Sequence, residues 1–226
     1  HLHVWGNSWR VVFRTPSLDY KNLGTPSFIN SFLTPDMYGK GFPSKPKSNK
    51  SFDKIALTAS LAYKLSENGG VLVFCGTTQF VDYIGNKIIQ LHNSIKSIHG
   101  EEWNENYSTN SYYFAKKIFG ENHWIAKCIS IGVGVHYGNL PEILRKNVEQ
   151  DYKNNNLKII LCTNTVCQGV NFPIKYIVVH SLILGYDQKM KRPIRLLQRD
   201  FENLIGRAGR AGYETEGLIF YVQNTS

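Results

Sequence analysis

No run of apolar residues in this sequence approaches the roughly 20 residues that a membrane-spanning helix requires. No signal-peptide pattern opens the chain, and its few cysteines form neither a CxxC pair nor a zinc-type spacing with histidine. Most of them lie in or beside apolar runs, where cysteine is usually a small buried hydrophobe. We therefore expect an intracellular protein (cytoplasmic, or nuclear or nucleoid-associated) with reduced thiols, no metal site and no membrane partner. The cysteines are Cys75, Cys128, Cys162 and Cys167.

Acidic residues are scarce, and the 17 acids against 26 lysines and arginines give a net charge of +9. The excess is confined to two segments. Residues 38–54 hold five lysines and one acid, and residues 175–210 hold eight basic residues and three acids. Concentrated basic charge predicts a polyanion-binding protein. For residues 38–54, a solvated basic linker is the alternative.

The length of 226 residues and the 42% apolar content suit one α/β domain with a well-buried core. Residues 1–50 show little periodicity beyond a short strand expected at Trp9–Phe13, and they end in a stretch rich in turn-forming residues. We therefore assign residues 1–50 to a linker or extension and residues 51–226 to the domain. The first residue is His rather than Met, so we expect a piece of a longer protein.

Short apolar runs alternate with stretches of helical periodicity after residue 51. Strands are expected at 71–75, from Ile129 into a turn before Pro141, and at 157–162, 175–180 and 217–222. Helices are expected at 55–65, from a Thr77 or Thr78 cap through Leu91, and near 112–119. A further helix is expected after a cap at Asn139, with Pro141 in its first turn. Its apolar stripe consists of Leu140, Leu144, Val148 and Tyr152. This alternation predicts a parallel sheet with helices on both faces, and ligands bind such sheets at the carboxyl ends of the strands.

Residues 201–212 combine two arginines with three glycines after a helical run. The three-residue spacing of Arg207 and Arg210 points both guanidinium groups the same way. Arginine makes bidentate contacts with phosphate, and the glycines allow close approach of a ligand. The segment thus suits an anion held from one side, with a solvated basic helix end as the alternative.

Three strings, in order along the chain, resemble the motifs of superfamily-two helicases of the Ski-two-like branch. GRAGRAG resembles the sixth motif, with Asn203 where glutamine is usual. Residues 163–173 resemble the fifth motif, TxTxxxGVNxP. Residues 132–163 resemble the pattern that precedes it, with His136, Arg145 and Glu149 in register and Tyr137 in place of a second histidine. The strand at 71–74 is similar to the fourth motif.

This resemblance implies that residues 51–226 are the second RecA-like motor domain of an ATP-dependent helicase or translocase. ATP and Mg²⁺ would be held mainly by an N-terminal RecA-like domain of the same polypeptide, because this chain has no GxxxxGK[ST] loop and no DExH string. The chain alone is therefore expected to be inactive. The alternatives are an ATP-independent nucleic-acid-binding module and an interaction scaffold on the same fold.

The resemblance also implies residue roles. Arg207 and Arg210 would act as arginine fingers on the γ-phosphate. The other ATP-binding residues would be Gly169, Asn171, Asn203 and Gly206. Single-stranded DNA or RNA would be held by Thr163, His136, Gly138, Lys189 and Lys191. A structural role for His136 and an ordinary strand-to-helix turn at Thr163 are the alternatives.

Residues 181–198 contain two β-compatible runs around an exposed basic stretch, which predicts a hairpin. In the related DNA helicases a hairpin at this position separates the duplex. By resemblance, Tyr186 or Met190 would stack on the last base pair. A plain connector is the alternative.

Overall fold

The computed structural model describes residues 2–5, 8–13, 27–34, 53–99, 108–164, 172, 174–208 and 217–222. The strands are β1 (Leu2–Trp5), β2 (Ser8–Phe13), β3 (Ser27–Leu33), β4 (Val71–Phe74), β5 (Val133–His136), β6 (Ile159–Cys162), β7 (Tyr176–Val179), β8 (Ile183–Asp187), β9 (Arg192–Arg195) and β10 (Leu218–Tyr221). The helices are α2 (Lys54–Ser66), α3 (Thr78–His99), α4 (Asn110–Phe119), α5 (Trp124–Ser130), α6 (Glu142–Lys153) and α7 (Gln198–Ile205).

A parallel five-stranded sheet in the order β10-β7-β4-β6-β5 forms the centre of the domain. Every residue of β4, β5, β6 and β7 is buried, as expected for parallel strands that are covered on both faces. The fold is therefore α/β with a RecA-like sheet, and the apolar runs predicted as buried strands are confirmed.

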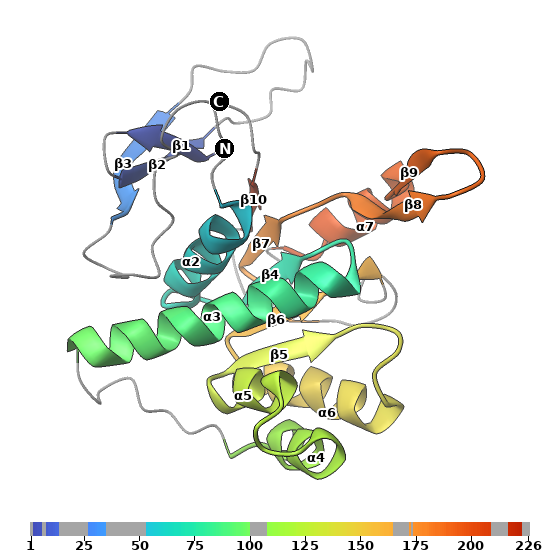
Figure 1. Cartoon of the computed structure of the whole chain (residues 1–226). Coiled ribbons are helices and arrows are strands. Elements are labelled where there is room, and N and C mark those ends of the chain that lie inside the picture. Colours follow the sequence, from blue (N-terminus) through green and yellow to red (C-terminus); the bar gives the residue numbers. More distant parts are fainter. Residues whose placement is uncertain are drawn as a thin grey trace.

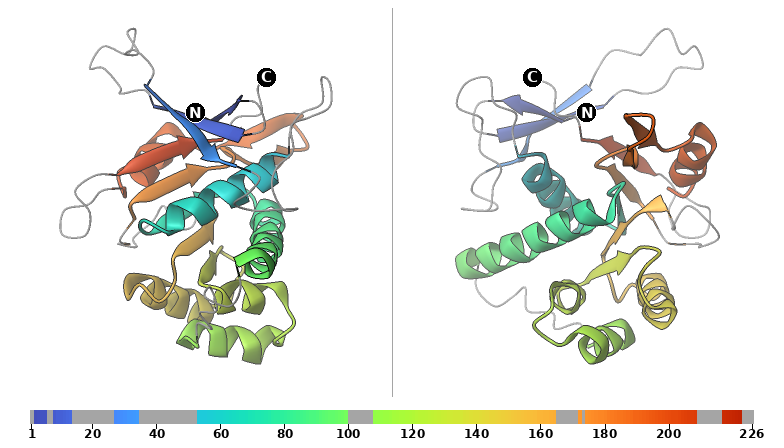
Figure 2. Two further views of the ribbon diagram at one scale, coloured as in Figure 1. Left: turned by 90° about the vertical axis from the view of Figure 1, so that its left-hand side faces the viewer. Right: turned by 45° about the vertical axis from the view of Figure 1, so that its right-hand side comes forward.

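Helices cover both faces of this sheet (Figures 1 and 2). On one face, α2 contacts α3, β4 and β7, while α3 also contacts α5. On the other face, α6 packs closely on β5, because a Cβ added at Gly134 would lie 2.9 Å from Val148 Cγ1. Leu140, Leu144, Val148 and Tyr152 are all buried, which confirms the predicted apolar stripe.

The N-terminal extension contains a small antiparallel sheet in the order β1-β2-β3. Strand β2 includes the strand predicted at Trp9–Phe13, whereas β1 and β3 were not predicted. Strand β3 contacts α2, and its last residue, Leu33, is fully buried with the main core. The small sheet accordingly lies beside α2, away from α4 and α6 (Figure 1).

Several boundaries differ from the sequence prediction, and α3 continues to His99 rather than ending at Leu91. Ile129 and Ser130 end α5, and the strand begins only at Val133. Helix α5 is held by His123, whose Nδ1 accepts from the Ile125 N–H at 3.3 Å, and by packing of Trp124 against Gly85 of α3. These tertiary contacts override the strand-like alternation after Ile129.

Helix α6 begins at Glu142, two residues later than a cap at Asn139 implies. Pro141 has an extended backbone with ψ of 135° and is itself the N-cap, without a side-chain cap hydrogen bond. The predicted cap at Asn139 was therefore wrong, and Asn139 is exposed. The predicted cap of α3 is confirmed at Thr77, whose Oγ1 accepts from the Phe80 N–H at 3.3 Å.

Cys75, Cys128 and Cys162 are buried, as predicted for small apolar side chains, and Cys167 lies outside the described residues. Among the helices that the structure describes, none has both the length and the apolar character needed to cross a membrane.

Candidate nucleic-acid and nucleotide sites

Two of the predicted nucleic-acid contacts meet at the carboxyl ends of neighbouring strands. His136 ends β5, and Thr163 follows β6 directly. The Thr163 N–H donates to the His136 carbonyl at 3.3 Å. Gly138 is exposed in the turn between β5 and α6. The structure therefore brings His136, Gly138 and Thr163 together at one edge of the sheet, where ligands of parallel sheets bind.

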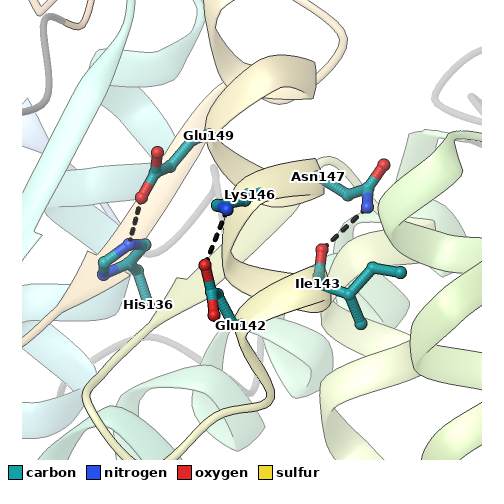
Figure 3. Close-up of polar contacts among 6 residues, drawn as sticks. All are labelled: His136, Glu142, Ile143, Lys146, Asn147 and Glu149. Carbon is teal, nitrogen blue, oxygen red and sulfur yellow. Dashed lines mark hydrogen bonds and ion pairs between the residues drawn. The ribbon is translucent and has the colours of Figure 1, made fainter.

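The His136 side chain is only 3% exposed and contacts Glu149 of α6, with 2.8 Å between Nε2 and Oε1 (Figure 3). Burial lowers the pKa of His136, although the hydrogen bond to Glu149 opposes this shift. The neutral ring then carries its proton on Nε2 and donates it to the carboxylate. The ring of His136 thus contacts α6, while its backbone carbonyl contacts Thr163.

The predicted hairpin is confirmed: β8 and β9 are antiparallel, and they project from the body of the domain (Figure 1). Asp187 stabilises its turn, because Oδ1 accepts from the backbone N–H groups of Lys189 at 2.9 Å and Met190 at 3.0 Å. Met190 is 63% exposed and Tyr186 is 54% exposed. The tip thus presents an apolar side chain between the exposed Lys189 and Lys191.

The base of the hairpin is joined to the same edge of the sheet. The His180 N–H donates to the Phe74 carbonyl at 2.9 Å, which continues the pairing of β7 with β4. Gly76 follows β4 with φ of +84°, and a Cβ there would lie 2.4 Å from the Ile183 carbonyl oxygen. Only glycine allows this approach. The hairpin therefore rises from a fixed position beside the strand ends.

The described part of the sixth-motif string, residues 206–208, lies apart from that edge. Ala208 forms a parallel bridge with Ile174, which lies two residues before the start of β7. Helix α7 thus leads the chain from the hairpin, at the carboxyl ends of the strands, back toward their amino ends, as the connection between two parallel strands must. Asn203 and Gly206 are exposed there, and Arg207 is 6% exposed.

The bridge joins Ala208, in the sixth-motif string, to Ile174, the residue directly after the fifth-motif string. Arg207 and the exposed Gly206 lie next to this bridge, and arginine is the residue type that makes bidentate contacts with phosphate. Gly169, Asn171 and Arg210, which were also predicted to contact ATP, lie outside the described residues.

Sequence reasoning assigned no role to two residues that shape these sites. Glu149 matched the helicase pattern in register, but its contact with His136 depends on the packing of α6 on β5. Gly76 had no comparable signal, because its close contact with residue 183 spans more than a hundred residues of sequence.

Comparison with known proteins identifies the domain. The model of the helicase conserved C-terminal domain matches residues 104–212. The Hachiman protein HamB of Bacillus cereus is 29% identical over 209 residues, covering 87% of this chain and 17% of HamB. The ATP-dependent DNA helicase Hel308 of Methanococcus vannielii is 29% identical over 195 residues, covering 84% of this chain and 24% of Hel308.

A third relative is the activating signal cointegrator 1 complex subunit 3 of Danio rerio, 33% identical over 89 residues, which cover 39% of this chain and 6% of the relative. The chain therefore spans less than a quarter of the length of each of these curated relatives.

Proposed function

This chain belongs to the helicase C-terminal domain family and is related to the Ski-two-like helicases of superfamily two, and on that basis we propose that it is the second motor domain of an ATP-dependent DNA helicase or translocase. The observation that carries the proposal is the bridge between Ala208 of the sixth-motif string and Ile174, which directly follows the fifth-motif string. The relatives named as DNA helicases favour DNA over RNA.

ATP would be held between this domain and a first RecA-like domain of the same polypeptide, which would supply the phosphate loop and most of the Mg²⁺ ligands. From this chain, Arg207 and Arg210 would stabilise the charge on the transferred phosphoryl group, with Gly169, Asn171, Asn203 and Gly206 lining the nucleotide. The Arg207 side chain is only 6% exposed, so a phosphate group would have to lie directly against the small part of it that reaches the surface.

Single-stranded DNA would lie along the carboxyl edge of the sheet. Thr163 and the exposed turn at Gly138 would contact its backbone, while Lys189 and Lys191 would attract phosphates. Closure of the two motor domains on ATP and reopening after hydrolysis would alternate this grip. The buried free thiols support an intracellular location for this activity.

The hairpin is proposed to separate the duplex, because its exposed tip combines Met190 and Tyr186 with flanking lysines. Replacing residues 188–191 of the full-length protein by Gly-Ser is expected to abolish duplex unwinding while DNA-stimulated ATP hydrolysis persists. Parallel unwinding and ATPase assays measure both. Unwinding at the original rate would make residues 181–198 a connector instead.

The proposed function is tested by ATP hydrolysis of the full-length protein with and without single-stranded DNA. We expect hydrolysis that DNA stimulates, and none from residues 1–226 alone. DNA binding without hydrolysis would indicate an ATP-independent binding module. Neither binding nor hydrolysis would indicate a scaffold.

A further inference from the structure

The connection between β5 and α6 is closed by a polar contact between His136 and Glu149. His136 Nε2 and Glu149 Oε1 are 2.8 Å apart and join the end of the strand to a point two turns into the helix. Helix α6 is already fixed by buried Leu144, Val148 and Tyr152. Glu149 itself is 24% exposed, at the rim of this packing.

The same histidine contacts Thr163 through its backbone. The His136 carbonyl accepts the Thr163 N–H at 3.3 Å, so a shift of His136 displaces the first residue of the fifth-motif string. Glu149 is thus linked through one residue to Thr163, and it also closes the exposed turn that contains Gly138 (Figure 3). Arg145, one turn before Glu149, is the other charged group that acts on the His136 ring.

We infer that Glu149 is a positioning residue for DNA: through His136 it holds Thr163 and the 137–141 turn in the geometry that contacts the phosphodiester backbone. The inference rests on the proposed function and adds a residue to it. Glu149 itself does not touch DNA. A purely structural role would leave DNA affinity unchanged in any variant that folds normally.

Helix α6 offers a matched control at Glu142, its first residue. Glu142 contacts Lys146 at 2.6 Å, and both side chains are about two-thirds exposed or more, at 68% and 72% (Figure 3). Removal of Glu142 also deletes one carboxylate and one ion pair from α6. It leaves the link between His136 and Thr163 intact.

The test measures three quantities on the full-length protein: the Kd for a single-stranded oligothymidylate, the DNA concentration that gives half-maximal ATPase, and the maximal rate. Glu149→Ala is expected to raise the first two about tenfold, as loss of a charge-assisted hydrogen bond would, and to lower the maximal rate by less than about threefold. Glu149→Gln, which retains an acceptor oxygen, is expected to restore affinity. Glu142→Ala is expected to match the wild type.

A second variant guards against misfolding. Glu149→Asp keeps the charge but is one carbon too short to reach Nε2, so it is expected to weaken DNA binding like Glu149→Ala. Wild-type affinity in both Glu149→Asp and Glu149→Ala would overturn the inference, as would equal losses in Glu142→Ala. Failure of the wild type to bind DNA would instead contradict the proposed function itself.

Discussion

At the scale of single residues, a buried histidine joins the hairpin to the core. His180 is 1% exposed, and its Nδ1 lies 2.8 Å from Oγ1 of Thr58 in α2. Thr58 donates its hydroxyl hydrogen to the Lys54 carbonyl, so the histidine ring must donate to Thr58. Phe80 of α3 packs against the ring with centroids 4.6 Å apart. The neutral ring is therefore part of the folded core.

This environment makes stability depend on pH. Burial, with a smaller contribution from Lys54, lowers the pKa of His180 to about 4 from an ordinary value of 6.5. The unfolded chain then binds a proton at this histidine more readily than the folded chain does. The contribution of the neutral His180 ring to the free energy of unfolding is therefore fully present above pH 6.5 and is lost as the pH falls toward 4. Burial also lowers the pKa of His92 and His136, which adds to the same trend.

We expect the free energy of unfolding to fall more steeply between pH 6.5 and 4 in the wild type than in His180→Asn, by up to roughly 3 kcal/mol. Asparagine retains a donor for Thr58 but does not titrate in this range. Urea unfolding of both proteins at several pH values measures the difference. Parallel pH profiles would contradict the assignment of His180 as a buried neutral group.

At the scale of elements, the hairpin base depends on Gly76. Alanine at this position would adopt an unfavourable φ of +84° and place its Cβ 2.4 Å from the Ile183 carbonyl oxygen. We expect Gly76→Ala to lower the free energy of unfolding by roughly 2–4 kcal/mol, because both strain and a backbone collision act together.

Gly120 provides the control for that prediction. Its φ of +89° is nearly the same, but a Cβ there would meet nothing within 4 Å. Gly120→Ala should therefore cost only about 1 kcal/mol, the conformational part alone. Equal losses in the two variants, measured by chemical denaturation, would show that the hairpin base is not tightly packed against Gly76.

Local sequence patterns predicted the buried strands and the hairpin because each depends on a short run of residues. Helix α5 was missed since its helical face is completed by Gly85 of α3, a contact that no local window contains. The candidate site was predictable only where its residues depend on a short run of sequence. Thr163 follows its strand directly, whereas the contact of Glu149 with His136 required the packing of α6 on β5.

At the scale of the whole molecule, the candidate residues fall into two groups. His136, Thr163 and the hairpin occupy the carboxyl edge of the sheet, while Arg207 lies beside the start of β7. Helix α7 connects the hairpin to the arginine segment directly. If the proposed roles hold, α7 is the element through which contact with the nucleotide would be linked to the edge proposed to hold DNA.

The central claim is that this domain supplies arginines to ATP hydrolysis, and the DNA-stimulated kcat of the full-length protein tests it most directly. Arg210→Lys and Arg207→Lys retain the charge but not the bidentate geometry, and each is expected to lower kcat by roughly 10³-fold or more while DNA affinity stays within about twofold. Arg199→Lys, at a residue 80% exposed on α7, is the matched control and should retain the wild-type rate. Near-wild-type kcat in both Arg210→Lys and Arg207→Lys would contradict the account.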